Sequence, residues 1–337
     1  MDYQKYTIAT LGSHSALQIL HGAKAENFNT LLITTPDREK FYKRFSFIDE
    51  VKTIPTFADF PTVEKDLKDK NVIIIPHGSF VAYLGVEKNK NMTLAYFGNK
   101  AVLDWEQDRD KQKKWLLESK INMPPQYDSI EKAQFPVIVK SFGAAGGAGY
   151  FLAKEKQEFE NKIKTFKSNK YIIQKYILGV TLYIHYFYSA LTNSLEILSM
   201  DRRYETNADG LGRIPAIMQQ EIDIDPSYVV VGNSPLVLRE SMLPEAYDMG
   251  ERLVASSKKL ISDKGLFGPF CLETIITPDM NFYAIEVSAR IVAGTNLFTD
   301  TSPYSIFHHE KPVSTGRRIA MEIKQAISEN KLELILD

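Results

Sequence analysis

The chain has few residues of the kinds that form disulfides or metal clusters. It contains one cysteine, Cys271, and 6 histidines in 337 residues. One cysteine cannot form an internal disulfide, and no Cys/His pattern has the spacing of a zinc site. We therefore expect Cys271 to be a packed core residue and not a nucleophile.

Long hydrophobic runs are also missing. No stretch reaches the roughly 18 consecutive apolar residues of a membrane-spanning helix. The N-terminal sequence MDYQKYTIATLGSHSAL lacks the basic region and the apolar run of a signal peptide. These absences predict a cytoplasmic protein with no membrane partner.

An excess of charge of either sign is absent as well. Lys and Arg number 41 and Asp and Glu number 42, which gives a net charge of −1. This balance favours no nucleic-acid partner, although a local basic pocket is compatible with it. The chain length predicts two or three domains.

Residues 6–97 alternate between strand-like and helix-like segments, which predicts a doubly wound, mostly parallel sheet. In such sheets ligands bind beyond the carboxyl ends of the strands. Two of these ends carry small polar residues, GSHS at 12–15 and PHGS at 76–79. We expect a ligand site there.

The rest of the chain predicts an α+β architecture. Residues 104–119 read as one charged helix, and the following segments read as a small hairpin unit and then as a larger group of strands around a helix at 244–263. The predicted domains are 1–98, 99–180 and 181–337.

The segment FPVIVKSFGAAGGAGYF, residues 135–151, places a glycine-rich loop between two apolar β-type runs. Its glycines do not match the G-x-G-x-x-G turn of a dinucleotide fold, and no Gly-Lys-Ser/Thr ends it as in a Walker A loop. A hairpin whose backbone N–H groups approach an anion fits, with Lys140 at its base. A mobile turn without a ligand is the alternative.

Glu273 and Glu286 occupy corresponding places in two apolar runs joined by the turn TPDMN. Antiparallel pairing of these runs would bring the two carboxylates side by side. Close carboxylates repel each other unless a cation lies between them, and oxygen ligands suit Mg²⁺. The alternative is a pair of solvent-facing glutamates on an edge hairpin.

Together, the glycine loop and the acidic hairpin resemble the ATP-grasp superfamily, whose members hold ATP between two α+β units. At closer range the chain resembles the archaeal PurP family, in blocks that include GSHSALQILHGAKAE, PHGSF, DRRYE, GNSPLVLRESML, GPFCLE and SARIVAGTN. The resemblance covers residues 6–330. It implies formate-dependent formylation of the ribonucleotide AICAR to FAICAR with ATP, in IMP biosynthesis, and a homo-oligomer.

The resemblance also implies roles for particular residues. Arg290 would act on phosphate or formyl phosphate, and Glu273 and Glu286 would hold Mg²⁺ or Mn²⁺. The residues implied for AICAR are His14, Ser79 and Asn233. Those implied for ATP are Lys111, Lys140, Gly146, Gly147, Gln174, Lys175, Ile177 and Glu205, with the backbone of 174–177 pairing with adenine.

Some positions depart from the family pattern. Ala145 and Ala148 stand where the family carries lysines, Lys175 where it carries Glu, and Ser288 where many ATP-grasp members carry Asn. A diverged paralogue is therefore the alternative, either a ligase for another carboxylate or amine or a non-catalytic nucleotide-binding protein. Arg202 and Arg203 lie in one β run, where only one of them can face the site.

Overall fold

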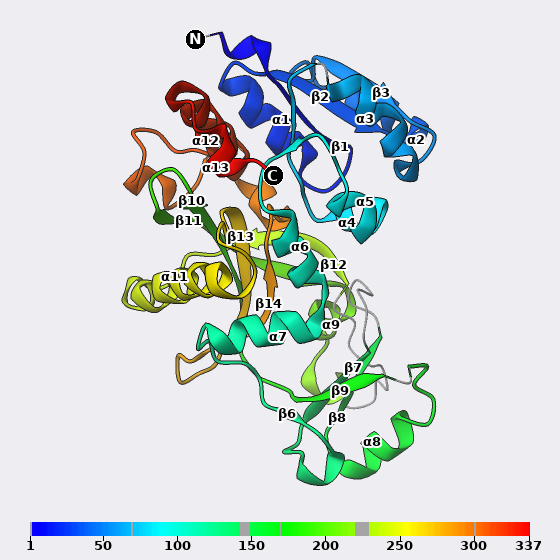
Figure 1. Cartoon of the computed structure of the whole chain (residues 1–337). Helices are drawn as coiled ribbons and strands as arrows, with labels where there is room; N and C mark the ends of the chain where they lie inside the picture. The colour runs from blue at the N-terminus through cyan, green and yellow to red at the C-terminus, as the bar shows by residue number, and fades with distance from the viewer. Residues whose placement is uncertain (1, 69, 142–148, 169, 220–228, 300) are drawn as a thin grey trace.

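The computed structural model describes residues 2–68, 70–141, 149–168, 170–219, 229–299 and 301–337. Figure 1 shows three sheets along the molecule: a parallel sheet with its helices, a large antiparallel sheet, and a small antiparallel sheet beside α8. In the part of the chain that is described, no helix is both long enough and apolar enough to span a bilayer.

The first sheet is parallel, with strand order β3-β2-β1-β4-β5. Its strands are β1 (Thr7–Leu11), β2 (Asn29–Thr34), β3 (Glu50–Thr53), β4 (Val72–Ile74) and β5 (Ala95–Tyr96). The helices between them are α1 (Ala16–Ala25), α2 (Pro36–Tyr42), α3 (Phe60–Lys68), α4 (Ser79–Leu84) and α5 (Val86–Lys90). The predicted doubly wound sheet is confirmed, and its order reverses at β1, so the loops after β1 and β4 adjoin one crevice.

The prediction of a single helix over residues 104–119 is wrong. The structure has two helices, α6 (Lys100–Gln107) and α7 (Arg109–Glu118). Asp108 separates them with an extended backbone, and its carboxylate accepts hydrogen bonds from the N–H groups of Asp110 and Lys111 at 2.9 and 3.1 Å. Asp108 is thus the N-cap of the second helix.

The small sheet contains the strands on both sides of the glycine-rich loop. Its order is β6-β9-β7-β8, with β6 (Gln126–Tyr127), β7 (Val137–Ser141), β8 (Tyr150–Ala153) and β9 (Tyr171–Lys175), and α8 (Lys156–Lys162) follows β8. The predicted antiparallel pairing is confirmed, since Val137 lies opposite Ala153 and Lys140 opposite Tyr150. Loop residues 142–148 lie outside the described residues.

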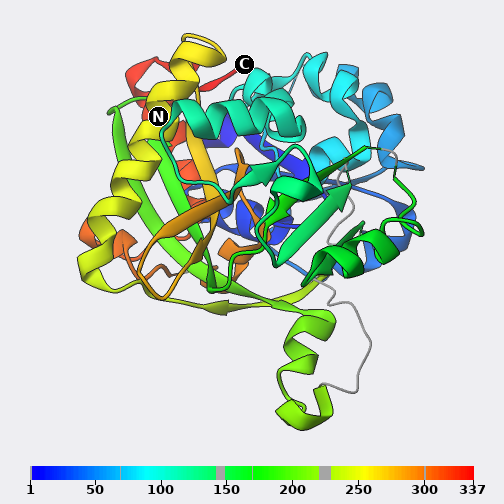
Figure 2. The ribbon, with the colours of Figure 1, turned by 90° about the horizontal axis from the view of Figure 1, so that it is seen from below.

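The large sheet is antiparallel, in the order β12-β11-β10-β13-β14. Its strands are β10 (Val180–Ser189), β11 (Ser194–Glu205), β12 (Val230–Pro235), β13 (Gly268–Ile276) and β14 (Phe282–Ser288). Helix α11 (Leu243–Leu260) packs on one face, whereas α9 (Thr206–Leu211) and α10 (Ala216–Gln219) follow β11 and project from the body in Figure 2. The edge strand β12 was not predicted, because VVGNSP combines Gly, Asn and Pro, which are typical of turns.

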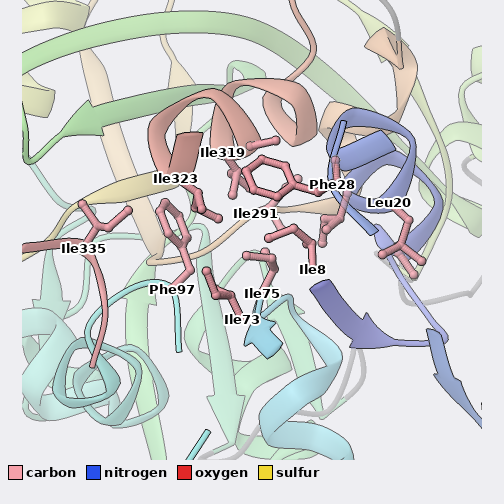
Figure 3. Packing of buried hydrophobic residues seen from close by; sticks show 14 of the residues in the cluster. Ile8, Leu20, Phe28, Ile73, Ile75, Phe97, Ile291, Ile319, Ile323 and Ile335 are labelled. Carbon is pink, nitrogen blue, oxygen red and sulfur yellow. The ribbon is translucent and has the colours of Figure 1, made fainter. Parts of the chain in front are cut away.

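The chain ends on the first domain. Helices α12 (Thr315–Glu329) and α13 (Leu332–Ile335) join the core beneath the parallel sheet, where Figure 3 shows Ile319, Ile323 and Ile335 among side chains of the N-terminal strands. Helix α12 approaches α1 closely, because a Cβ on Gly22 would collide with the backbone of α12. The domain limits predicted above remain a prediction.

Short 3₁₀ helices complete the connections. They cover Tyr3–Lys5, Phe57–Asp59, Ile130–Lys132, Glu240–Met242, Ala293–Phe298 and Ser305–Phe307. Cys271 is fully buried on β13, as predicted for a core residue. Residues 183–189, rich in aromatic side chains, form most of the central strand β10 and are mostly buried.

Candidate active site

A cavity of about 660 Å³ lies where the three sheets meet. Because side chains alternate along a strand, the parts of the large sheet that border this cavity present alternate residues to it. From β11 these are Arg203 and Glu205, from β13 Glu273, and from β14 Glu286 and Ser288. The opposite face of the sheet carries the apolar residues that pack against α11.

The cavity gathers most of the residues predicted for the site. Those that line it are His14, Lys140, Gln174, Lys175, Ile177, Glu205, Asn233, Glu273, Glu286 and Arg290. They come from all three predicted domains, so their assembly depends on the complete fold. Gly146 and Gly147 lie outside the described residues.

The structure does not bring Lys111 to the cavity wall. Its ammonium group is paired with Asp104 at 2.6 Å, and Asp104 belongs to the preceding helix. Arg109, the first residue of α7, lines the cavity instead. The helix break at Asp108 explains the difference, because it turns the start of α7 toward the site.

Ser79 lies beside the cavity and not in its wall. It is the first residue of α4, and its hydroxyl donates to the Ser13 hydroxyl at 3.1 Å. Ser13 is in turn 3.1 Å from the Tyr83 hydroxyl, to which Arg38 donates at 3.3 Å. These groups form a polar cluster at the carboxyl ends of β1 and β4, next to His14.

His14 is held in a strained turn at the same edge, with a φ of 52°. Its Nδ1 is 2.8 Å from the Ser15 hydroxyl, and its ring stacks on His77 with centroids 5.5 Å apart. Burial and the nearby Arg290 guanidinium lower the pKa of His14 to about 2. His14 is therefore a neutral hydrogen-bonding group.

Glu273 and Glu286 are directly opposite each other on β13 and β14, as predicted. Glu273 receives two hydrogen bonds from Arg203, at 2.8 and 3.2 Å, which is a bidentate ion pair. Ser288 lies on the same face, 3.4 Å from the Glu273 carboxylate.

Arg203, and not Arg202, faces the site. Its guanidinium lies 3.7 Å from the centre of the Tyr183 ring, besides its pairing with Glu273. Arg202 points the other way and pairs with Asp209 on α9. Sequence alone could not choose between them, since either phase of the alternation was possible.

Glu106 is a site residue that the sequence analysis missed. Its carboxylate accepts from Arg290 at 3.0 Å and from the Ala289 N–H at 2.7 Å, with a side chain only 10% exposed. Gly78 is part of the same contact, since a Cβ there would lie 2.7 Å from the His14 ring and 3.1 Å from the Arg290 guanidinium. Arg290 is thus held between an acidic helix end and the first sheet.

Carboxylates in this cavity are costly to ionise. Burial, and then the charges of Glu273 and Glu106, raise the pKa of Glu286 to about 7. Burial and the nearby Asp209 raise the pKa of Glu205 to about 7. Such shifts indicate that the site has room for added positive charge.

Lys140 shows the opposite shift. Burial and the charge of Arg109 lower its pKa to about 8. Its ammonium group donates to the Gln174 amide oxygen at 2.9 Å, which ties β7 to β9. Lys140 is therefore a desolvated cation at the base of the glycine-rich loop.

The backbone of residues 174–177, predicted to pair with adenine, already uses two of its donors within the protein. The N–H of Lys175 donates to the Pro125 carbonyl at 2.8 Å and that of Tyr176 to the Pro136 carbonyl at 3.0 Å. These two donors are committed to the protein.

The paired carboxylates fit a divalent cation in charge and in donor type. The charge of Glu273 makes Glu286 harder to ionise, and a bound Mg²⁺ or Mn²⁺, which prefers oxygen ligands, would relieve this repulsion. Over the described ranges, no group of three or more His, Cys, Asp and Glu side chains is arranged to hold a metal. Glu273 and Glu286 are therefore the residues that would hold such a cation.

Comparison with known proteins gives matches along the whole chain. Residues 8–127 match a protein family of unknown function (DUF1246), 107–180 a RimK-like ATP-grasp domain, and 151–337 a domain of unknown function (DUF1297). Among solved structures, an N5-carboxyaminoimidazole ribonucleotide synthetase in complex with ADP matches 95% of this chain and 76% of its own at a TM-score of 0.66 and 12% identity, which shows a shared fold.

Full-length relatives are closer. The 5-formaminoimidazole-4-carboxamide-1-(beta)-D-ribofuranosyl 5'-monophosphate synthetase of Pyrococcus horikoshii is 48% identical over 98% of this chain and 99% of its own, and that of Methanobrevibacter smithii is 45% identical over 99% and 95%. The crystal structure of an IMP biosynthesis protein PurP from Thermococcus kodakaraensis matches 98% of this chain and 100% of its own, with a TM-score of 0.80 and 32% identity. The chain therefore belongs to the PurP family of 5-formaminoimidazole-4-carboxamide ribonucleotide synthetases, which has the ATP-grasp fold.

Proposed function

We propose that this protein is an ATP-dependent C–N ligase that formylates AICAR to FAICAR in IMP biosynthesis, with release of ADP and phosphate. In the first step an oxygen of formate attacks the γ-phosphorus of ATP, and the bond to the ADP oxygen breaks. In the second step the amine of AICAR attacks the carbonyl carbon of formyl phosphate, phosphate leaves, and the amine loses a proton. Catalysis of this kind rests on positioning, charge stabilisation and exclusion of water.

The ATP-binding part of the cavity is assigned to the small sheet and to the acidic wall, which is formed by Glu273 and Glu286. Lys140 supplies a cation at the base of the loop, and residues 174–177 bind the base at the hinge. Glu205, on the facing strand, is placed for the ribose hydroxyls. Glu273 and Glu286 would hold Mg²⁺ or Mn²⁺, which when bound neutralises phosphate charge.

Arg290 is assigned to the acyl phosphate. It lies between the acidic wall and the first sheet, where the two substrates would meet, and Glu106 fixes its guanidinium. Planar guanidinium groups bind phosphate oxygens bidentately. Arg290 would therefore stabilise the charge that shifts between phosphorus and the leaving oxygen.

AICAR is assigned to the first sheet and β12. His14, being neutral, can donate or accept a hydrogen bond without adding charge, and Asn233 lines the same cavity. Ser79, with Ser13 and Arg38, forms a polar and cationic cluster suited to the ribose phosphate. A cytoplasmic location, expected from the sequence, and a homo-oligomer, implied by the family resemblance alone, are also part of the proposal.

The observation that carries the proposal is the assembly of Glu273, Glu286, Arg203, Arg290 and Lys140 in one cavity of a PurP-family fold. The test is an assay of ADP and FAICAR release with ATP, formate, AICAR and Mg²⁺, and with each omitted in turn. The expected result is release of both products only when all four are present. Failure to form FAICAR or ADP above background at millimolar substrates would refute the proposal.

A ligase for another carboxylate or amine is the second candidate. It is favoured by Lys175, which lines the cavity where the family resemblance implies a glutamate. A screen of acids and amines for stimulated ADP release distinguishes the two. Nucleotide binding without turnover on any substrate would instead indicate a non-catalytic binding protein.

A further inference from the structure

Three polar side chains form a continuous chain from the interior of the large sheet to the cavity. His185 Nε2 on β10 lies 2.6 Å from one oxygen of Asp201 on β11. The other Asp201 oxygen accepts a hydrogen bond from Asn233 Nδ2 on β12, also at 2.6 Å. His185 and Asp201 are buried, at 1% and 0% exposure, and Asn233 lines the cavity.

Asp201 is closely enclosed. A Cβ on Gly294 would overlap its carboxylate, so the chain at that position passes directly over it. Enclosure keeps water from serving as an alternative partner for either oxygen. A buried carboxylate keeps its hydrogen bonds because losing one leaves the charge uncompensated. The contact with Asn233 is therefore a fixed feature of the fold.

The chemistry of a carboxylate determines which way the Asn233 amide is turned. An amide has a donor branch and an acceptor branch, and a carboxylate accepts only. The Nδ2 branch must face Asp201, and the planar amide then directs its Oδ1 branch away from Asp201. With a neutral partner in place of Asp201, both orientations would be possible.

We propose that Asp201 is a positioning residue that fixes the Asn233 amide so that its carbonyl oxygen accepts a hydrogen bond from an N–H group of the substrate. This inference rests on the proposed function. AICAR offers two such donors, its exocyclic amine and its carboxamide. The same geometry discriminates against a ligand with an acceptor at that position, because two acceptors would face each other.

A double-mutant cycle tests the coupling. Calorimetric Kd values for AICAR are measured for the wild-type protein, N233A, D201N and N233A/D201N. We expect each single variant to weaken AICAR binding about tenfold, as for loss of one hydrogen bond to a buried partner. Because Asp201 acts through Asn233, the double variant should bind within about twofold of N233A. If the double variant instead weakened binding by the product of the two single fold-changes, Asp201 and Asn233 would act independently and the proposal would be overturned.

ATP affinity and a distant variant serve as controls. The Kd for ATP should be unchanged in N233A and D201N, and Y204F, which alters an exposed residue of the same strand, should bind AICAR as the wild type does. A loss of ATP binding in D201N equal to the loss of AICAR binding would mean general damage to the sheet and would also overturn the positioning role.

Substrate analogues keep the test independent of the folding of D201N. One imidazole ribonucleotide carries a carboxylate in place of the carboxamide, and another carries hydrogen in place of the amine. The wild-type protein should bind AICAR about tenfold more tightly than one of these analogues, and N233A should lose that preference. The analogue concerned identifies whether the carboxamide or the amine is the donor to Asn233. If N233A keeps both preferences, the proposal fails. If the wild-type protein binds no AICAR, the proposed function fails instead.

Discussion

Strand β11 carries a carboxylate near each end, the buried Glu196 and the half-buried Glu205, and the pKa values of the two are shifted in opposite directions. Near its start, Glu196 is paired with His309 at 2.9 Å and with Arg318 at 2.8 Å, and these partners overcome burial to lower its pKa to about 2. At its other end, burial and Asp209 raise the pKa of Glu205 to about 7. Glu286, two strands beyond β10, shows the same rise.

The first end has its charges balanced by the protein itself. Arg318 also pairs with Glu322 at 2.9 Å and lies 4.1 Å from the centre of the Phe187 ring. A surface hollow of about 750 Å³ lies over this network, but the buried charges beneath it are already paired. At the active-site end the pKa values of Glu205 and Glu286 are raised instead, which we interpret as a site whose charge is completed by a ligand.

The largest predicted effect is on turnover at the active-site end. E286Q keeps the shape of the side chain but removes the charge proposed to hold the metal, so kcat/KM should fall about 10³-fold. E196Q, the matched change at the other end, should leave kcat/KM within about twofold of wild type. Steady-state FAICAR formation measures both, and equal losses in the two variants would contradict the contrast.

Stability should respond in the reverse order. E196Q removes the buried charge that pairs with His309 and, together with Glu322, with Arg318, and should lower the free energy of unfolding by about 3 kcal/mol. E286Q removes a carboxylate that folding makes harder to ionise, so metal-free E286Q should be as stable as the wild type or more stable. Urea unfolding at pH 8 gives both values.

The pH dependence of stability separates the two ends. Because its pKa is raised by folding, Glu286 contributes most to the free energy of unfolding below pH 4.5, and this contribution is lost as the pH rises through about 7. The lowered pKa of Glu196 contributes above pH 4.5 and is lost as pH falls toward about 2. For metal-free protein, the free energy of unfolding should decline less between pH 5 and 8 in E286Q than in the wild type. In E196Q the decline should equal that of the wild type.

A smaller effect is expected from the support of Arg290. E106Q retains the shape but weakens the ion pair with Arg290, so kcat should fall about 10- to 100-fold, as for residues that orient a site group. The KM for ATP should change little, because Glu106 contacts Arg290 and the Ala289 backbone. An unchanged kcat would show that Arg290 needs no such support.

The smallest effect is expected at the first sheet. R38A removes the cation that donates to Tyr83 in the cluster with Ser13 and Ser79, so the KM for AICAR should rise about tenfold with little change in kcat. The KM for formate serves as the control and should stay constant. A similar rise in both would place Arg38 outside the phosphate site.

Much of the fold follows from local patterns in the sequence. The alternation over residues 6–97 predicts the parallel sheet, and two apolar runs of equal phase predict that Glu273 lies opposite Glu286. These signals are local, since each depends on residues close along the chain. They were sufficient for the main elements and for the acidic pair.

The missed features depend on tertiary packing. Glu106 stands in a run of charged residues, where nothing distinguishes a buried partner of Arg290 from a solvated glutamate. The helix break at Asp108 is a capping choice within an otherwise helical sequence. Strand β12 pairs along one edge only, and its Gly, Asn and Pro residues are typical of turns, so the pairing with β11 could not be read from the sequence.

Binding of Mn²⁺ together with ATP, counted by electron paramagnetic resonance, tests the account most directly. At pH 8 the wild-type protein and E196Q should bind the metal with equal affinity, and E286Q should bind it at least about tenfold more weakly, because one of two protein ligands is lost. Wild-type affinity should itself fall below about pH 7 as Glu286 gains a proton. Undiminished binding by E286Q would contradict the assignment of the acidic pair as the metal site.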